Sequence, residues 1–242
     1  MKRKSANIDL SRTEYTLVFS DSAEGGTGYC LIKKCPVSMR ADLFEYCAYK
    51  LFLAGAKSVL LGVENGLRPA VKKMNFSSMD AVYESSILHM SRIVPEETHL
   101  RTLLRLEPVK SGQTDQYKRM YNRIFTDTDN VSSALRSEVE RNIARKGYEV
   151  MFAVVSGEKV GLCEVDISGD DSVIETVGID EEFRGQGFSR MVLQNIFNIL
   201  NISGVRKTNL IVSSANKAAF SLYKSEGFRT ENVLSKWYRL TL

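Results

Sequence analysis

The sequence is poor in the residues that build disulfide-rich, metal-bound or proline-rich proteins. Its 242 residues include only two histidines, four prolines and one tryptophan. The four cysteines form no CxxC pair, and neither histidine stands at a spacing that would complete a zinc site with them: Cys30, Cys35, Cys47 and Cys163. We therefore expect four reduced thiols, buried as small hydrophobic groups, in a cytoplasmic protein without a bound metal.

Long apolar runs are also missing. The most apolar window, residues 51–63, is interrupted by Lys57 and falls far short of the roughly 20 residues needed to cross a bilayer. The basic start, residues 1–4, is followed by polar and charged residues rather than by the apolar stretch of an export signal. The sequence thus predicts no membrane segment.

Charge of one sign is not concentrated anywhere in the chain. Thirty-three Lys and Arg residues against 29 Asp and Glu leave a net charge of +4, and both signs are spread along the whole length. No stripe of basic residues interleaved with aromatics is present, so we expect no nucleic-acid partner. A single basic cleft for a small polyanion would still be compatible with this balance.

The residues that are present suit a globular protein, and their pattern is clearest in the last two fifths of the chain. Hydrophobic residues make up 43% and charged residues 26% of the sequence, which is enough to bury a substantial core. Three apolar or alternating runs separated by turn residues predict a three-stranded meander over 148–155, 160–167 and 172–179. From Phe188 the apolar residues recur at helical spacing, and Gly204 is a plausible stop.

The remaining elements complete a mixed fold. A short strand over 209–212 precedes a helix over 216–226, with Asn216 as its cap and Gly227 at the left-handed closing position. Other segments follow the same rules: strands at 102–106 and 233–242, and helices at 113–125 and 134–146. The predicted fold class is α/β (α+β), with a mixed, mostly antiparallel sheet flanked by helices.

The first hundred residues show a weaker copy of the same pattern. A helix is predicted over 40–55, a strand over 57–64, and a second helix that Asn65 opens and residues 71–76 end. Asn75 would then stand before Phe76 as Gly227 stands before Phe228. This similarity favours two related halves, 1–95 and 100–242, although two strand–helix units can also resemble each other by chance.

The segment with most chemical information joins the strand that ends at Ile179 to the helix that begins at Phe188. Gly185 and Gly187 stand at alternate positions, which lets successive N–H groups point into one concavity at a helix N-terminus. Such a concavity suits a phosphate, although a plain strand-to-helix turn has the same composition. A Walker loop is excluded because Phe188 replaces its lysine, and a dinucleotide fingerprint is excluded because Arg190 replaces its third glycine.

Two motifs resemble the GNAT-type N-acetyltransferases. Residues 184–189 (RGQGFS) resemble the family's Arg/Gln-x-x-Gly-x-Gly/Ala loop, with Ser189 in place of Gly or Ala. Residues 216–228 (NKAAFSLYKSEGF) resemble its Asn-x-x-Ala-x-x-Leu-Tyr-x-x-x-Gly-Phe helix. The resemblance covers about residues 104–242, and it makes 1–95 a degenerate GNAT-like half. That half lacks the glycine loop, so we expect it to bind no CoA. Instead, we expect it to support the sheet or to form one wall of the acceptor cleft.

The resemblance implies that acetyl-CoA is the donor and that an acetyl group passes directly to a primary amine of a small molecule or peptide. The pyrophosphate would lie on the loop amides and the pantetheine arm along the strand edge, an arrangement similar to strand addition. Arg184 and Arg190 would add charge near the phosphates or simply be solvated. The implied donor-binding residues are Val177, Gly178, Ile179, Arg184, Gly185, Gln186, Gly187, Phe188, Ser189, Asn216 and Ala219.

Two side chains are the predicted catalytic residues. Tyr223 stands where the family usually places the tyrosine that faces the thioester sulfur, so we expect it to be the general acid; an aromatic packed on its helix is the simpler alternative. Strand alternation puts Glu175 on one face with Val177 and Ile179, which favours it as the base, directly or through water. A solvated glutamate fits the position equally. A main-chain N–H near Gly178 or Ile179 would stabilise the carbonyl oxygen.

A catalytically silent CoA- or acyl-CoA-binding regulatory module is the alternative function. The sequence favours the enzyme because Tyr223 and the whole second motif remain. No pattern identifies the acceptor or the oligomeric state: Asp127, Asp129 and Glu138 would attract a cationic amine, but solvated helix ends explain them as well.

Overall fold

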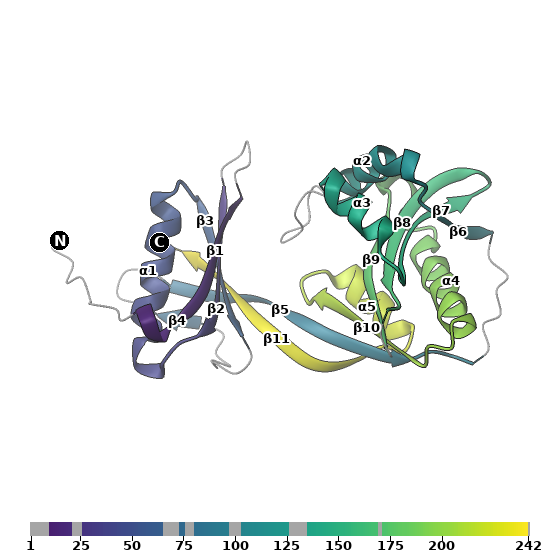
Figure 1. Ribbon diagram of the computed structural model, residues 1–242. Coiled ribbons are helices and arrows are strands. Elements are labelled where there is room, and N and C mark those ends of the chain that lie inside the picture. Colours follow the sequence, from purple (N-terminus) through teal and green to yellow (C-terminus); the bar gives the residue numbers. More distant parts are fainter. Residues whose placement is uncertain are drawn as a thin grey trace. The chain divides into compact units, whose positions relative to one another are not determined.

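The chain folds into two units in the computed structural model (Figure 1). The structure describes residues 10–20, 26–64, 73–75, 80–96, 103–125, 135–168 and 171–241. The first unit comprises residues 1–89, 212–220 and 230–242, and the second unit comprises residues 90–211 and 221–229. The first boundary between the units falls between residues 89 and 90, and two later segments belong to the first unit.

The second unit is built on a sheet with helices on both faces, which confirms the predicted fold class. Its strands are adjacent in the order β6 (Leu104–Pro108), β7 (Tyr148–Val155), β8 (Glu158–Asp166), β9 (Ser172–Ile179) and β10 (Lys207–Ser213). The first four are antiparallel, and β9 and β10 are parallel. Two helices, α2 (Thr114–Phe125) and α3 (Arg136–Ala144), cover one face, and α4 (Phe188–Ile202) covers the other (Figure 1).

Apolar side chains on both faces explain why this sheet is stable. On the α2 and α3 side, Tyr117 is fully buried and its ring lies 5.7 Å from that of Phe152. On the other side, α4 buries residues at helical spacing: Val192, Leu193, Ile196, Phe197 and Leu200. The predicted change from strand to helix at Phe188 is confirmed, and Gly204 adopts the left-handed conformation just after the helix.

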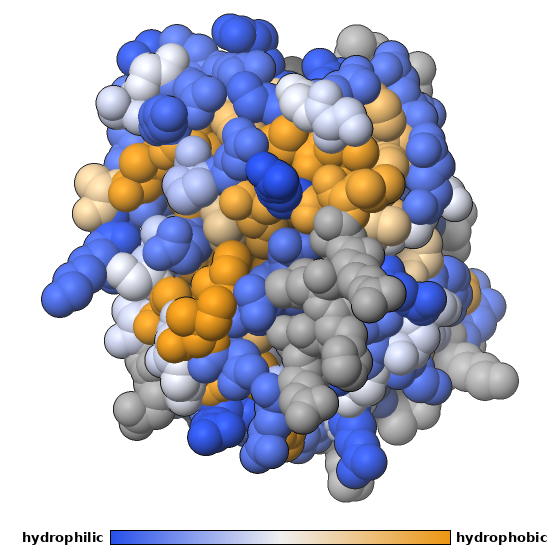
Figure 2. All heavy atoms as spheres, turned by 90° about the vertical axis from the view of Figure 1, so that its right-hand side faces the viewer, coloured by the Kyte–Doolittle hydropathy of each residue, from blue (hydrophilic) through white to orange (hydrophobic). Residues whose placement is uncertain are grey.

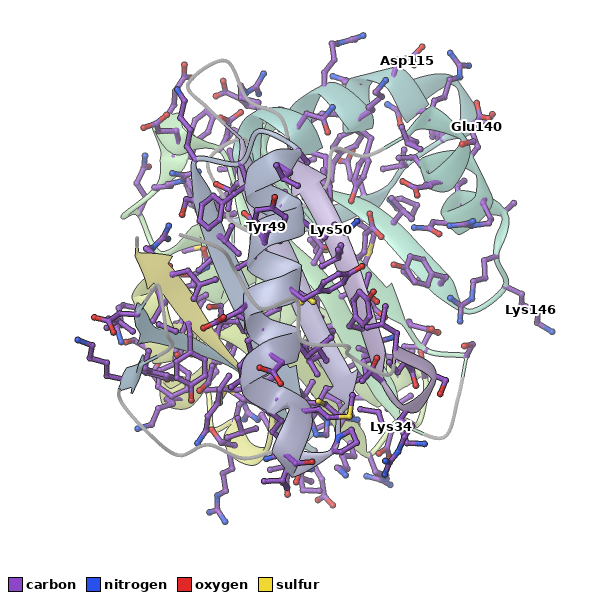
Figure 3. All side chains as sticks on the ribbon, turned by 90° about the vertical axis from the view of Figure 1, so that its left-hand side faces the viewer. Lys34, Tyr49, Lys50, Asp115, Glu140 and Lys146 are labelled. Atoms are coloured by element: carbon purple, nitrogen blue, oxygen red, sulfur yellow. The ribbon has the colours of Figure 1, made fainter. Side chains whose placement is uncertain are left out.

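The strands of the first unit come from both ends of the chain and belong to the same 11-stranded sheet. Their order is β1 (Glu14–Ser20), β2 (Thr27–Lys34), β3 (Ser58–Glu64) and β11 (Arg229–Thr241). Ser235 to Leu240 of β11 pair antiparallel with β3. Helix α1 (Arg40–Leu53) buries Leu43, Cys47 and Leu51 in the core of this unit, while Tyr49 and Lys50 lie on its outer face (Figure 3).

The expected second helix of the first half is wrong where the structure describes it. Residues 65–72 lie outside the described residues, but Lys73–Asn75 form the short strand β4, which pairs with β5 (Asp80–Ile93). Asn75 opposes Asp80 in this ladder and therefore does not close a helix. Antiparallel pairing with the next strand of the chain has overridden the helical pattern. The two related halves remain a prediction, without this support.

The surface of the second unit retains apolar side chains. On the side that carries β6 and α4, orange patches lie among polar side chains (Figure 2). Ile93, Leu103 and Ile202 are among the large apolar residues of this unit that are mostly exposed. No helix within the described ranges is both long and apolar enough to cross a bilayer.

Gly161→Ala is expected to destabilise the second unit. A methyl group at Gly161 of β8 would lie 2.3 Å from the carbonyl oxygen of Gly178 and 2.7 Å from Ile179 Cδ1, so β9 would have to move. We expect the free energy of unfolding to fall by about 1–3 kcal/mol in urea titrations. Gly112→Ala is the control, because its methyl group would meet no described atom within 4 Å. Equal stability of the two variants would contradict the close approach of β8 and β9.

Candidate functional site

The strands β9 and β10 separate before β9 ends. Their parallel pairing is limited to Ser172–Ile174 against Thr208–Leu210, whereas β9 continues to Ile179. On its other side β9 remains paired with β8 as far as Ile179 opposite Gly161. Within the described residues, the edge of β9 over 175–179 that faces away from β8 therefore has no strand partner.

Hydrogen-bond alternation determines which groups lie on this open edge. The N–H of Asp180 donates to the carbonyl of Val160 at 3.0 Å, which continues the ladder with β8. Because successive residues of an antiparallel strand face opposite sides, the N–H of Gly178 also faces β8, while those of Val177 and Ile179 face the open edge. Of the two amides expected near the acetyl carbonyl, only that of Ile179 points outward.

Gly185 and Gly187 give the loop before α4 its shape. Their φ angles are 78° and 81°, in the left-handed region that other residues rarely adopt, and a Cβ at either position would meet no described atom. Backbone conformation rather than lack of space therefore requires glycine here.

The amides at the start of α4 have no acceptor among the residues that the structure describes. Gly187 is the N-cap, and its carbonyl accepts from Arg190 and Met191. In the part of the chain that the structure describes, the N–H groups of residues 185–189 donate to no main-chain carbonyl. Unpaired donors at the N-terminus of a 15-residue helix provide positive potential for an anion with several oxygens, such as a diphosphate.

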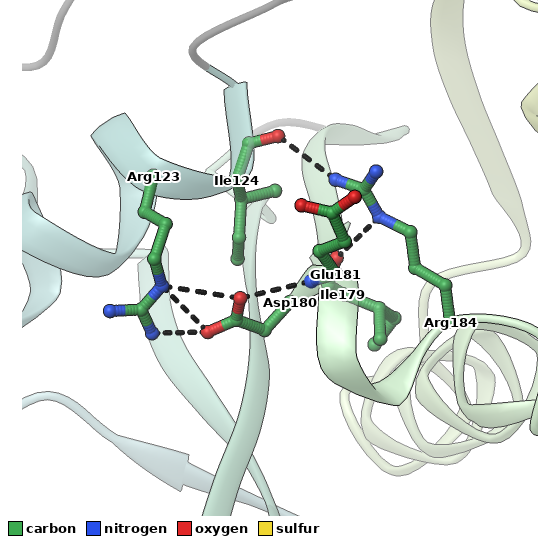
Figure 4. A network of polar contacts seen from close by, with 6 residues as sticks. All are labelled: Arg123, Ile124, Ile179, Asp180, Glu181 and Arg184. Carbon is green, nitrogen blue, oxygen red and sulfur yellow. Dashed lines mark hydrogen bonds and ion pairs between the residues drawn. The ribbon is translucent and has the colours of Figure 1, made fainter.

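A polar network holds this loop against β9 and the end of α2 (Figure 4). The buried Asp180 accepts from the N–H of Glu181 at 2.9 Å and from the guanidinium of Arg123. Its hydrogen bond with Arg123 is the main cause that lowers the pKa of Asp180. Arg184 donates to the carbonyls of Ile179 and Ile124 at 3.2 and 3.3 Å. The Arg184 side chain therefore anchors the loop, which the sequence did not indicate.

Tyr223 is a nearly buried phenol. It lies on α5 (Lys217–Ser225), is 9% exposed, and its ring meets that of Phe228 edge-on at 5.7 Å. Its hydroxyl makes no hydrogen bond within the described residues. Burial raises its pKa to about 12, so the hydroxyl stays protonated at physiological pH. The hydroxyl therefore carries a proton, and its raised pKa makes it a weaker acid than an exposed tyrosine.

Glu175 lies in a β-bulge. Thr176 opposes Glu164 and Ile174 opposes Val165, so Glu175 is the extra residue of β9. The expectation that it shares a face with Val177 and Ile179 assumed strict alternation, and the bulge breaks that alternation. The Glu175 side chain is exposed, but the protein atoms around it partly desolvate it and raise its pKa; the charges of Asp166 and Glu164 raise the pKa further, while Arg145 opposes the shift. These neighbours associate Glu175 with the face of the sheet that α2 and α3 cover.

Glu164 is a buried carboxylate that sequence reasoning missed. It is 7% exposed on β8 and accepts hydrogen bonds from Tyr117 at 2.8 Å, Tyr148 at 2.6 Å and Asn142 at 3.3 Å. Burial and the nearby Glu164 carboxylate raise the pKa of both tyrosines. The segment 160–167 reads as alternating apolar and polar residues, which predicts one solvated face. Helices cover both faces here, so the glutamate is enclosed.

Asn216 caps α5, as predicted: its Oδ1 accepts from the N–H of Ala219 at 3.0 Å. Asn216 and Ala219 belong to the first unit, whereas the other expected site residues belong to the second unit. Those of the second unit are Glu175, Val177, Gly178, Ile179, Arg184, Gly185, Gln186, Gly187, Phe188, Ser189 and Tyr223.

Comparison with known proteins relates this arrangement to one family. Residues 114–228 match the family model described as the acetyltransferase (GNAT) family. The ribosomal protein bS18-alanine N-acetyltransferase of Salmonella typhimurium is 30% identical over 69 residues, which are 28% of this chain and 47% of the relative. Its Escherichia coli K12 counterpart is 26% identical over 86 residues, 36% of this chain and 58% of the relative. The chain thus spans about half the length of these curated relatives.

The fold comparison agrees with the sequence comparison. A GCN5-related N-acetyltransferase from Sphaerobacter thermophilus has a TM-score of 0.64 and 15% identity, over 94% of this chain and 76% of that chain. At this identity the likeness concerns the fold alone. Residues 114–228, which include the open strand edge and the unpaired loop amides, form a domain of the GNAT acetyltransferase family.

Proposed function

We propose that the protein transfers the acetyl group of acetyl-CoA directly to a primary amine of a small molecule or peptide. The observation that carries this proposal is the row of unpaired amides over residues 185–189, which begins just beyond the open edge of β9. A donor with a diphosphate at one end and amides along its arm matches these two features. Tyr223, which belongs to the same unit, supplies an acid.

The donor would lie with its diphosphate on the loop amides and its pantetheine amides along the edge at Val177 and Ile179. Extended amides pair with a strand edge through the same hydrogen bonds that join two strands. The outward N–H of Ile179 would then donate to the thioester carbonyl oxygen and stabilise the negative charge that develops there.

The chemistry that follows needs one base and one acid. The amine lone pair attacks the thioester carbon while Glu175, directly or through water, accepts the proton that the nitrogen loses. The tetrahedral intermediate then collapses, the C–S bond breaks, and the Tyr223 hydroxyl gives its proton to the departing thiolate. The products are an N-acetyl amide and free CoA.

A test with purified full-length protein separates this enzyme from a silent CoA-binding module. Acetyl-CoA is supplied with peptides that have a free N-terminal alanine, peptides with an internal lysine, polyamines and amino sugars. The alanyl peptides are included because the bS18 relatives are named for that residue. Acceptor-dependent thiol release with an acetylated product supports the proposal. Saturable CoA binding without such release would favour the regulatory module, and absence of both would contradict both.

Gly187→Ala is expected to weaken acetyl-CoA binding about tenfold, which corresponds to about 1.4 kcal/mol. The left-handed conformation costs an alanine roughly 1–2 kcal/mol, and relaxation of this strain turns the loop amides away from the diphosphate. Isothermal titration calorimetry measures the change in Kd. Gly204→Ala is the matched control, because Gly204 is also left-handed with no atom near its Cβ, but at the other end of α4. Equal loss of affinity in both variants would contradict the assignment of the loop.

A further inference from the structure

The last turn of α5 is bonded to the first turn of α4. Arg190, three residues after Gly187, places its Nε 2.7 Å from Glu226 Oε1, and its Nη2 donates to Ser225 Oγ at 2.9 Å. Glu226 follows Tyr223 by three residues, so both lie at the same end of α5. These contacts therefore join the loop that would hold the donor phosphates to the turn that carries the proposed acid.

A second arginine fixes the same carboxylate. Nη1 of Arg92, on β5, donates to the main-chain carbonyl of Glu226 and lies 3.9 Å from its Oε2. The guanidinium also stacks over the ring of Phe197 at 4.4 Å. The guanidinium also lies against Gly227, where a Cβ would be in ordinary van der Waals contact with Arg92 Cζ at 3.6 Å. Glu226 thus connects α4, α5 and β5.

The burial of these side chains shows that Glu226 is the fixed member of the group. Its side chain is 13% exposed, against 21% for Arg92 and 52% for Arg190. A fully exposed ion pair contributes at most about 1 kcal/mol to stability, partly because both side chains remain free to move. The Glu226 carboxylate is instead enclosed between two arginines, which hold its side chain in one conformation.

The position of the Tyr223 hydroxyl depends on this conformation of Glu226. Because it makes no hydrogen bond within the described residues, only its ring and its helix hold it in place. The ring contacts Phe228, whose centroid lies 6.1 Å from that of Phe197 on α4, and the N–H of Phe228 donates to the carbonyl of Tyr223 at 3.0 Å. Phe197 is the same ring that Arg92 covers. Movement of Glu226 would therefore displace Tyr223 relative to the loop.

We propose that Glu226, held by Arg190 and Arg92, is a positioning residue that sets the place of the Tyr223 hydroxyl relative to the phosphate-binding loop. This inference rests on the proposed function, since it assigns Tyr223 as the acid. Glu226 itself touches neither substrate: it acts through the end of α5. Misplacement of a catalytic group by about 1 Å can cost a factor of up to about 100 in rate.

The test measures steady-state kinetics with acetyl-CoA and the best amine from the acceptor panel. Glu226→Gln is expected to lower kcat about tenfold while KM for acetyl-CoA changes less than about twofold. The reason is that the Tyr223 hydroxyl moves away from the phosphate-binding loop, whereas the loop itself keeps its conformation. Glu226→Asp, which keeps the charge, is expected to restore part of the rate.

In a Tyr223→Phe background, Glu226→Gln is expected to cause no further fall in kcat, because both changes remove the same contribution. Glu140→Gln, which breaks an exposed ion pair with Arg136 on α3, is the control (Figure 3 labels Glu140).

Three kinetic results would overturn the inference. These are an unchanged kcat, a raised KM for acetyl-CoA with kcat preserved, and a full additional loss in the Tyr223→Phe background. A second readout does not need turnover. In protein with ring-labelled tyrosine, the NMR signal of Tyr223 is identified as the one that Tyr223→Phe removes. Its chemical shift is expected to change in Glu226→Gln and to remain unchanged in Glu140→Gln. An unmoved signal would overturn the inference even if no amine were acetylated, whereas absence of wild-type turnover alone would contradict only the proposed function.

Discussion

Tyr223→Phe is expected to lower kcat for acetyl transfer by about 100-fold, the size typical of a lost general acid. The ring and its contact with Phe228 remain in this variant, and only the proton donor is removed. Without it, CoA must leave as an unprotonated thiolate. We expect Kd for acetyl-CoA to stay within about twofold, because the loop amides that would bind the diphosphate are unchanged. Stopped-flow thiol release and calorimetry measure the two quantities separately.

The pH profile gives this prediction a further check. Since burial raises the pKa of Tyr223 to about 12, its proton is present at all lower pH values and is lost only as the pH approaches that value. Tyr223→Phe should therefore lower the rate without changing the shape of the profile below about pH 10. Tyr49→Phe, on the exposed face of α1, is the control. Turnover equal to that of the wild type would refute the assignment of Tyr223 as the acid.

Glu175→Gln is expected to lower kcat/KM by about 100-fold and to remove the acidic limb of the pH profile. The base form of Glu175 is the carboxylate, so activity should rise as the pH passes through its pKa. Partial desolvation, together with the charges of Asp166 and Glu164, raises that pKa above the ordinary value of a glutamate. The variant cannot titrate, and any limb that remains belongs to the amine of the acceptor. Initial rates across a pH series, with acetyl-CoA saturating, measure both effects.

Glu158→Gln is the matched control for this prediction, because Glu158 is an exposed carboxylate at the start of the neighbouring strand β8. It should behave like the wild type. If Glu175→Gln also kept the acidic limb, the base would have to be another group. A variant that loses the limb but keeps its rate would show that titration of Glu175 affects binding rather than proton transfer.

Local signals made part of the structure predictable. The strand 172–179 was expected with the bounds that β9 has, and the helix after it begins at Phe188 as expected. Both follow from a change of apolar period and from glycines whose left-handed conformation the structure contains at Gly185, Gly187 and Gly227. The loop and the α5 cap were predictable for the same reason: their chemistry lies within a few consecutive residues.

Features that depend on distant parts of the chain were not predictable. Nothing near Glu164 indicates that Tyr117 and Asn142 would enclose it. The bulge at Glu175 is likewise set by the register between β8 and β9. In each case tertiary contacts chose one of several conformations that the local residues allow.

The pairing of β11 with β3 has a consequence for folding during synthesis. β3 lies near the beginning of the chain, but the residues that pair with its second edge are 235–240. Until the ribosome has added them, that edge offers unpaired backbone groups to any other extended segment. Helix α1 and strands β1 to β3 therefore remain incompletely paired until residues 235–240, which follow the second unit in the sequence, have been synthesised.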